Sequence, residues 1–318
     1  MGKQIPPLAG AATTVTNILA IDIGGSKILA GVVDSSGEVR GEKIIIPEKP
    51  GEAALLTDIY SLCDSFLNDF EVSAIGLSIP GIVDAEKGLW LEAVFSKVRN
   101  FPLRDILKEK YKLPVCLEND ANNCALGEKF FGFAKDCDDF IWLTVSNGCG
   151  AGIFLNGKLF TGAGGHAGEL GHICVTDEDF ICPCGNKGCL EASAAGPGIS
   201  RRYKALSGEE LSAKEIAARA VSGEENAAAV FRKTGEYLGT AIAAAVNVTN
   251  VPLVIIGGGI SMNYDLFCEE MERTVQKKIY LTANKSLQIM RTKLGYQASL
   301  IGAAANYLYR LQSAPVEC

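Results

Sequence analysis

The chain has 318 residues, a length that suits two domains of about 100–200 residues each. Its net charge is −7, its pI is near 5.1, and no basic cluster exceeds a pair such as Arg201-Arg202, which argues against a nucleic-acid partner. No apolar run approaches the roughly 18 residues of a membrane span, and the first residues lack the basic start and apolar core of a signal peptide. We therefore expect a cytoplasmic protein without nucleic-acid or membrane partners.

The start of the chain is small, polar and proline-containing, and we expect a short disordered tail over residues 1–17. The sequence has 11 cysteines, an odd number that does not suit complete pairing, and a reducing compartment disfavours a disulfide framework. Eight of them are scattered and are expected to be buried free thiols. Cys182, Cys184 and Cys189 are clustered and need another explanation.

Apolar runs separated by turn residues predict an order of strands and helices that occurs twice along the chain. In the first half we expect strands over residues 18–23, 27–34, 39–46, 73–79 and 114–118, and helices over residues 52–70 and 103–111. In the second half we expect strands over residues 140–145, 151–155, 158–160 and 251–256, a largely helical stretch over residues 208–249, and a closing helix over residues 298–311.

This repeat predicts an α/β fold of two similar lobes, with a ligand cleft between them. We place the N-terminal lobe at residues 18–119, closed by a C-terminal helix over residues 300–318, and the larger C-terminal lobe at residues 120–299. No linker-like stretch separates the lobes, so we expect them to pack closely and to hinge.

Two glycine turns occupy equivalent places in the repeat, each after the first strand of a lobe. The first, Gly24-Gly25-Ser26-Lys27, follows Asp22. Its glycines would let backbone N–H groups approach phosphate oxygens, and Asp22 could hold Mg²⁺ through water. The second turn carries Gly148, Gly150 and Gly152. A turn between two strands is often purely structural, but two such turns that face each other predict a phosphate clamp.

Glu118-Asn119-Asp120 ends an apolar strand, and polar side chains at such strand ends face the crevice of α/β folds. Asn119 can donate to and accept from a sugar hydroxyl. Asp120 can take the proton from a hydroxyl that attacks a phosphoryl group. The residues after Asp120 have a helical pattern, so Asp120 is equally suited to capping that helix. The local sequence leaves both interpretations of Asp120 open.

One histidine and three cysteines lie within 18 residues, namely His172, Cys182, Cys184 and Cys189. They form a Cys₃His set of the kind that holds structural zinc, and redox-active thiols are the alternative. A catalytic zinc is disfavoured because four protein ligands leave no open position. His166, the other histidine, is expected to be an ordinary loop residue.

Glu169 and Glu191 flank the clustered cysteines in the sequence. A metal loop that fixes both carboxylates would prepare a site for a polyol, and exposed loop glutamates are the alternative. The Gly257-Gly258-Gly259 run follows a buried strand. It could admit the face of an adenosine or form an ordinary turn between a strand and a helix.

Five segments, in order, resemble the ROK family of sugar kinases and sugar-responsive regulators: IDIGGSK (21–27), ENDANNCALGE (118–128), GAGGHAGELGH (162–172), CPCGNKGCLE (182–191) and VIIGGG (254–259). The resemblance covers nearly all of the chain from about Asn17. It implies a two-lobed, actin-like (ribonuclease H-like) ATPase fold and a homodimer or higher homo-oligomer. It also implies phosphorylation of a hexose or N-acetylhexosamine by Mg-ATP, with glucose as the commonest acceptor.

The resemblance also implies roles for individual residues. Asp120 would be the catalytic base, and the sugar contacts would be Asn119, Glu169, His172, Glu191 and the loop at Gly81. Structural Zn²⁺ would be held by His172, Cys182, Cys184 and Cys189. The contacts to ATP and Mg²⁺ would be Asp22, Gly24, Gly25, Ser26, Lys27, Asn147, Gly148, Gly258 and Gly259.

The sequence departs from the family pattern at two places. The second phosphate loop often reads Gly-Thr-Gly in the family and here reads Ser146-Asn147-Gly148. Asn147 keeps a side-chain donor but lacks the threonine hydroxyl. The sugar-side loop often carries Pro-Asn-Leu, and residues 93–100 offer no matching asparagine in that context, which leaves the sugar open.

These observations leave three functions in competition. The first is an ATP-dependent sugar kinase. The second is a sugar-responsive transcriptional regulator, which we expect to need a helix-turn-helix of several dozen residues where this sequence has only residues 1–17. The third is a sugar-binding homologue of weak activity, an alternative motivated by Asn147.

Overall fold

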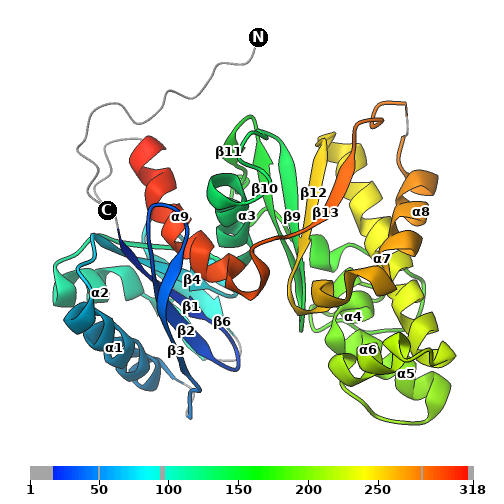
Figure 1. The fold of residues 1–318 in the computed structure, drawn as a ribbon, viewed down its shortest axis with the longest axis horizontal. Helices are drawn as coiled ribbons and strands as arrows, with labels where there is room; N and C mark the ends of the chain where they lie inside the picture. The colour runs from blue at the N-terminus through cyan, green and yellow to red at the C-terminus, as the bar shows by residue number, and fades with distance from the viewer. Residues whose placement is uncertain (1–16, 49–50, 94–96, 281, 314–318) are drawn as a thin grey trace.

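A computed structural model of the protein describes residues 17–48, 51–93, 97–280 and 282–313. Apart from Asn17, the predicted tail over residues 1–17 lies outside these ranges, as do residues 314–318 of the predicted C-terminal helix. The strands of the described residues form two five-stranded sheets and one three-stranded sheet. Figure 1 shows the two larger sheets side by side, each with helices on its outer face.

The N-terminal sheet has the strand order β3-β2-β1-β4-β8. Its strands are β1 (Ile18–Ile23), β2 (Ile28–Val33), β3 (Val39–Ile45), β4 (Ala74–Ile79) and β8 (Val115–Asn119). β1 pairs antiparallel with β2 and parallel with β4, which in turn pairs parallel with β8. The carboxyl ends of β1, β4 and β8 therefore meet at one edge, where Asp22 lies beside Ser78 and Ile79 beside Asn119.

The C-terminal sheet repeats this arrangement in the order β11-β10-β9-β12-β13. Its strands are β9 (Phe140–Val145), β10 (Cys149–Leu155), β11 (Lys158–Leu159), β12 (Leu253–Gly257) and β13 (Gln288–Arg291). β9 pairs antiparallel with β10 and parallel with β12, as β1 does with β2 and β4. The predicted repeat is confirmed, and the predicted strands end within two residues of those observed.

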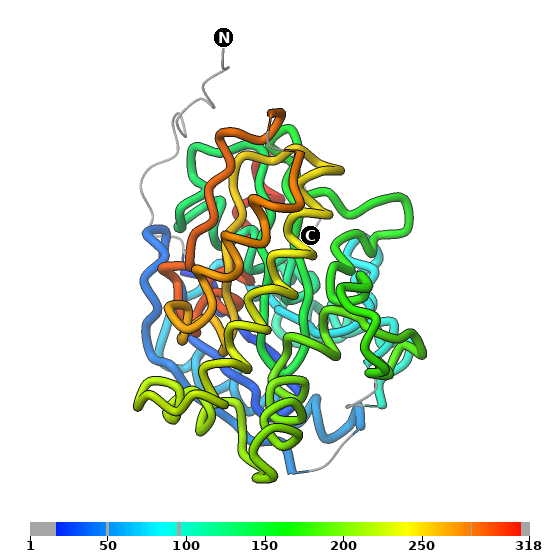
Figure 2. The backbone as a smooth tube through the Cα atoms, turned by 90° about the vertical axis from the view of Figure 1, so that its right-hand side faces the viewer, coloured from blue at the N-terminus to red at the C-terminus, as the bar shows by residue number. Residues whose placement is uncertain are grey.

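Helices cover the outer face of each sheet. On the N-terminal sheet these are α1 (Glu52–Asp69) and α2 (Leu103–Tyr111), whose buried leucines, isoleucine and phenylalanine join the apolar side chains of the strands. On the C-terminal sheet they are α4 (Leu190–Ala194), α5 (Gly196–Ser207), α6 (Ala213–Val221), α7 (Glu225–Thr249) and α8 (Cys268–Lys278). Figure 2 looks onto this second outer face, with α7 running through the centre of the view.

Two helices, α3 (Asp120–Phe131) and α9 (Ala298–Ser313), lie between the sheets (Figure 1). α3 follows β8 of the N-terminal sheet, yet its apolar side chains pack with those of β9 and β10. α9 comes from the far end of the chain and packs Leu300, Ala303 and Ala304 on β1 and β2. A Cβ atom on Gly302 would lie 1.9 Å from the carbonyl oxygen of Asn123, so the glycine permits the close crossing of α9 and α3.

Several elements were not predicted from the sequence. They include the three-stranded sheet of β5 (Ile82–Asp84), β6 (Leu89–Ala93) and β7 (Val98–Phe101), the helices α4, α5 and α8, and the edge strand β13. Short 3₁₀ helices occur at Leu170–His172, Gly259–Leu266 and Gly295–Gln297. Within the described part of the chain, no helix combines the length and the apolar character that a membrane span requires.

Candidate active site

A cavity of about 620 Å³, which we call the central cavity, lies between the two lobes. The N-terminal lobe lines it with residues that follow β4 and β8, and the C-terminal lobe with the β9–β10 turn and the loop over residues 165–172. Seven residues predicted for the site line this cavity: Gly81, Asn119, Asp120, Gly148, Glu169, His172 and Glu191. The fold thus brings the predicted sugar-side residues and the second glycine turn together.

Asp120 is the first residue of α3 and lines the central cavity. Its Oδ1 accepts a hydrogen bond from the backbone N–H of Ala121 at 2.9 Å. Burial, together with the negative charges of Asp22 and Glu169, raises the pKa of the Asp120 carboxyl from 3.8 to about 6. At neutral pH the group is therefore ionised but holds a proton more tightly than an ordinary aspartate, which suits a general base.

The cap of α3 is Asn119, one residue before the position that the sequence suggested. Its Oδ1 accepts hydrogen bonds from the N–H groups of Ala121 at 2.9 Å and Asn122 at 3.3 Å. Asp120 is already helical, because β8 continues through Asn119, so capping is not the role of Asp120. The Nδ2 of Asn119 donates to the carbonyl oxygen of Gly81 at 3.2 Å, which leaves its second N–H for a ligand.

Asp22 lies at the carboxyl end of β1 and is held by two serines. Its Oδ1 accepts a hydrogen bond from the Oγ of Ser299 at 2.7 Å, and that hydroxyl lies 2.5 Å from the Oγ of Ser78. Burial raises the pKa of Asp22, and the two serine hydroxyls and Lys27 oppose the shift. Asp22 and Asp120 place two carboxylates near one another at one sheet edge, an arrangement that favours a divalent cation.

The first glycine turn is closed by a hydrogen bond from the N–H of Gly24 to the carbonyl oxygen of Lys27 at 2.8 Å. Gly25, Ser26 and Lys27 are exposed in this turn, so their donors are open to a ligand.

The second glycine turn is held from both sides. The N–H of Ser146 donates to the carbonyl oxygen of Gly148, and the N–H of Gly196 donates to that of Ser146, both at 2.8 Å. Asn147 is exposed at the tip. A Cβ atom on Gly259 would lie 3.3 Å from the Oγ of Ser146, so the Gly258-Gly259 turn lies directly beside this one. Two of the predicted nucleotide segments are thus neighbours.

His172, Cys182, Cys184 and Cys189 come together, with one potential ligand atom from each lying within 4.8 Å of the others. Cys182 Sγ lies 3.6 Å from His172 Nδ1, and Cys184 Sγ lies 3.7 Å from Cys189 Sγ. Tetrahedral zinc with Zn–S bonds of about 2.3 Å would place two sulfurs about 3.8 Å apart, whereas a disulfide needs about 2.05 Å. The donor set and its spacing therefore fit a tetrahedral metal ion.

This Cys₃His cluster adjoins the central cavity through His172. The Nδ1 atom of His172 faces the cysteines, while its Nε2 lies 3.7 Å from Glu169 Oε2. Glu191 follows Cys189 by two residues, and its Oε2 accepts a hydrogen bond from the N–H of Cys149 at 3.1 Å. The cluster thus adjoins the segments that carry Glu169 and Glu191, two of the carboxylates that line the central cavity.

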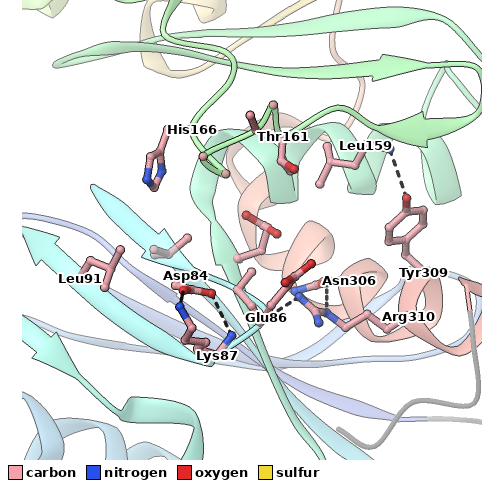
Figure 3. A pocket seen from close by; sticks show the side chains of 17 residues that line it. Asp84, Glu86, Lys87, Leu91, Leu159, Thr161, His166, Asn306, Tyr309 and Arg310 are labelled. Carbon is pink, nitrogen blue, oxygen red and sulfur yellow. Dashed lines mark hydrogen bonds and ion pairs between the residues drawn. The ribbon is translucent and has the colours of Figure 1, made fainter.

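His166 lies on a loop, as predicted, but the structure gives it a more specific place. It lines the central cavity and also a neighbouring cavity, which is drawn in Figure 3. The loop around it contains Gly162, Gly164, Gly165 and Gly168, which is the feature of the sequence that could have indicated a ligand-facing segment.

The sequence model of the ROK family matches residues 18–309. The chain belongs to the ROK family. Among curated ROK relatives, the glucokinase of Halalkalibacterium halodurans is 33% identical, and the alignment covers 89% of this chain and 92% of that protein. The xylose repressor of Caldicellulosiruptor bescii is 32% identical, with coverage of 99% and 84%. The family relatives thus include both kinases and regulators.

Solved structures of ROK proteins agree with this assignment. The ROK hexokinase of Thermus thermophilus has a TM-score of 0.81 at 30% identity, covering 94% of this chain and 100% of that one. The ROK glucokinase of Streptomyces griseus, solved with glucose and AMPPNP, has a TM-score of 0.81 at 29% identity, with coverage of 93% and 99%. A ROK transcriptional regulator reaches 0.85 at 29% identity, with coverage of 93% and 78%. The predicted two-lobed actin-like fold is confirmed.

Proposed function

We propose that this ROK protein transfers the γ-phosphoryl group of ATP to a hydroxyl of a hexose, with glucose as the leading acceptor. The observation that carries the proposal is Asp120, a cavity-lining carboxylate whose pKa is raised to about 6 beside the second carboxylate, Asp22. The glucokinase relatives and the nucleotide analogue in the S. griseus glucokinase support a kinase.

In the proposed reaction, Asp120 accepts the proton of the attacking sugar hydroxyl. The hydroxyl oxygen forms a bond to the γ-phosphorus while the bond from that phosphorus to the bridging oxygen breaks, and ADP leaves with the electron pair. Asn119, Glu169 and Glu191 line the same cavity and would orient the sugar. The exposed donors of the two glycine turns would bind the phosphates, and Asp22 would hold Mg²⁺, which neutralises phosphate charge.

We further propose that the Cys₃His cluster holds structural Zn²⁺, because its donor atoms fit a tetrahedral ion. The metal would keep His172 and the neighbouring glutamates in place and would use all four protein ligands. Three reduced thiols suit the cytoplasm. A homodimer or higher homo-oligomer is part of the same proposal.

A second candidate function is sugar binding without efficient turnover, in a regulator or a weak kinase. Asn147 favours it, because this exposed residue stands where the family often has threonine. The repressor relatives favour it as well.

One experiment separates these functions. Purified protein is assayed for ATP-dependent phosphorylation of glucose, fructose, mannose, allose and their N-acetylated relatives, and calorimetry measures binding of the same sugars. Turnover of at least one hexose supports the kinase. Binding without turnover favours the second candidate, and specific operator binding in a mobility-shift assay would identify a regulator.

A further inference from the structure

Cys174 is a cysteine that the Cys₃His cluster does not use. It follows His172 by two residues and is exposed, so the expectation that the scattered cysteines are buried is wrong for this one. Among the cysteines that the structure describes, the other exposed one is Cys184, which belongs to the cluster. Small oxidants in solution reach an exposed thiol, whereas a buried structural cysteine is inert. Cys174 is therefore the thiol beside the cluster that is open to oxidation.

Cys174 lies directly opposite Cys189 in a short antiparallel pairing. On one side of the pair, the N–H of Val175 donates to the carbonyl oxygen of Gly188 at 2.8 Å. On the other side, the N–H of Leu190 donates to the carbonyl oxygen of the residue before Cys174, at 2.9 Å. These bonds flank the two cysteines and do not join them, which is the pattern of a non-hydrogen-bonded pair. The Cα atoms of such a pair lie about 4.5 Å apart.

The spacing of this pair suits a disulfide. A disulfide joins residues whose Cα atoms lie about 4.4–6.8 Å apart and whose Cβ atoms lie about 3.5–4.5 Å apart. Residues directly opposite each other on antiparallel strands have Cβ atoms on the same face, about 4.5–5.5 Å apart, and non-hydrogen-bonded pairs are the closer ones. The sulfurs of Cys174 and Cys189 can therefore meet after rotation of the side chains and a small approach of the two segments.

Gly188 leaves room for the Cys174 sulfur next to Cys189. A Cβ atom on Gly188 would lie 3.1 Å from Cys174 Sγ and 1.9 Å from the carbonyl oxygen of Thr176. Cys174 Sγ donates to that same carbonyl oxygen at 3.3 Å. The thiol thus already lies against the residue that precedes Cys189. Turning it toward Cys189 breaks one weak S–H hydrogen bond, because sulfur is a poor donor.

We propose that Cys174 and Cys189 form a redox pair, which a peroxide oxidises to a disulfide with release of the zinc. The inference rests on the proposed structural zinc and is independent of the kinase activity. Hydrogen peroxide transfers one oxygen atom to the thiol of Cys174, which becomes a sulfenic acid while water leaves. The Cys189 sulfur then attacks the Cys174 sulfur. The S–S bond forms, the S–O bond breaks and hydroxide leaves, so the two cysteines lose the two electrons that the peroxide gains.

The disulfide takes from the cluster one of its four ligands. The remaining ligands, His172 and two cysteines, hold zinc less firmly than a complete tetrahedral set, so the ion leaves. Cys189 is also the cap residue of α4, and Glu191 in the first turn of that helix lines the central cavity. His172 lines the same cavity. Oxidation at the exposed Cys174 therefore reaches two residues of the candidate active site through the metal loop.

The test treats full-length, zinc-loaded protein with hydrogen peroxide and follows the released zinc with a coloured chelator. Mass spectrometry of peptides from the unreduced protein should find Cys174 joined to Cys189. Cys174→Ser should release zinc at least about tenfold more slowly, because the cluster then lacks its oxidised partner. Cys268→Ser removes a half-buried thiol outside the cluster and should behave like the wild type. Dithiothreitol with added Zn²⁺ should reload the wild type, and thermal unfolding before oxidation verifies that each variant folds.

Zinc analysis of the reduced protein separates the failures from one another. A reduced chain that holds no zinc overturns the structural zinc and the redox pair together. Zinc that leaves Cys174→Ser as fast as the wild type overturns the redox pair alone, because the oxidant then attacks the cluster itself, as at the exposed Cys184. A disulfide that excludes Cys174 overturns it as well. Absence of turnover with every sugar overturns the kinase and leaves the redox result standing.

Discussion

The Oγ of Ser299 donates a hydrogen bond of 2.7 Å to the Oδ1 of Asp22, although the two residues lie 277 positions apart in the chain. Ser299 stands in the first turn of α9, and Asp22 stands at the end of the first strand. The contact therefore joins the last helix to the proposed cation-binding carboxylate. It stabilises the ionised form of Asp22 against the burial that raises its pKa.

Replacing Ser299 with alanine should raise the pKa of Asp22 further, because it removes a hydrogen bond to the charged form. A hydrogen bond to a charged group contributes about 1.5–3 kcal/mol, so we expect KM for Mg-ATP to rise about tenfold or more. The increase in KM should be larger at pH 6 than at pH 8, since a carboxylate with a raised pKa is more protonated at low pH. Steady-state kinetics at both pH values measure it, with Ser207→Ala on α5 as the control. An equal increase in KM at both pH values would contradict the role given to Ser299.

Asp120→Asn should retain sugar and zinc binding but lose turnover by a factor of about 10²–10⁴, the usual contribution of a general base. The amide matches the carboxylate in shape and cannot accept the proton. Kinetic assays, sugar calorimetry and zinc analysis on the same preparation check all three expectations. Asp84→Asn, at the end of β5, is a control carboxylate that does not line the central cavity. Turnover like that of the wild type in Asp120→Asn would remove Asp120 from the mechanism.

The reaction should lose rate as the pH falls through about 6, because protonated Asp120 cannot act as a base. The sugar kcat/KM should fall about tenfold per pH unit below that value and level off above it. ATP itself gains a proton in this range. The binding of Mg-ATP is therefore measured at the same pH values, and the rates are corrected for its pH dependence. A profile that stays flat from pH 8 to pH 5 after this correction would exclude Asp120 as the titrating group.

Asp120 should also make the protein less stable at neutral pH. Its folded-state pKa of about 6 lies above the ordinary 3.8, so the folded state binds the proton more tightly and the free energy of unfolding rises as the pH falls through 6 toward 4. After allowance for partial exposure, the ionised carboxylate costs about 1–2 kcal/mol at pH 7. Asp120→Asn should therefore be more stable than the wild type at pH 7, and the difference should vanish near pH 4. Chemical denaturation at the two pH values measures this difference.

Removal of the metal should loosen the segment from His172 to Glu191 and weaken sugar binding. Elemental analysis should find about one zinc per chain, and Cys189→Ser should lose most of it. A chelator should lower the Tm of the wild type and raise the sugar Kd, since Glu169 and Glu191 lose their support. Cys268→Ser is the control thiol outside the cluster, and it should keep its zinc. Full activity in a zinc-free chain would contradict the proposed structural zinc.

Local sequence patterns predicted the central strands of the two large sheets because these strands are continuous apolar runs, buried on both faces, such as Ile28–Val33 and Leu253–Gly257. The three-stranded sheet escaped prediction because its strands are short and partly polar, as in Val98–Phe101, where Arg99 and Asn100 are exposed. The edge strand Gln288–Arg291 has no fully buried residue and pairs only through its contact with β12. Such elements depend on tertiary pairing more than on their own sequence.

Some residues of the candidate site could likewise be predicted from the sequence, and others could not. The Cys₃His set could be predicted because its spacing alone identifies it, and the structure brings the four residues together. The capping role of Asn119 could not be predicted, since it depends on the residue at which β8 ends.

α3 packs on the C-terminal sheet and α9 on the N-terminal sheet. This arrangement has a consequence for folding during synthesis on the ribosome. Ile18, Ala20, Leu29 and Val33 form an apolar face that is covered by Leu300, Ala303 and Ala304. The ribosome makes this face first and its cover almost last. One apolar face of the N-terminal sheet therefore stays uncovered until nearly the whole chain has been synthesised. The part of the fold that is synthesised first is therefore completed last, when α9 packs on β1 and β2.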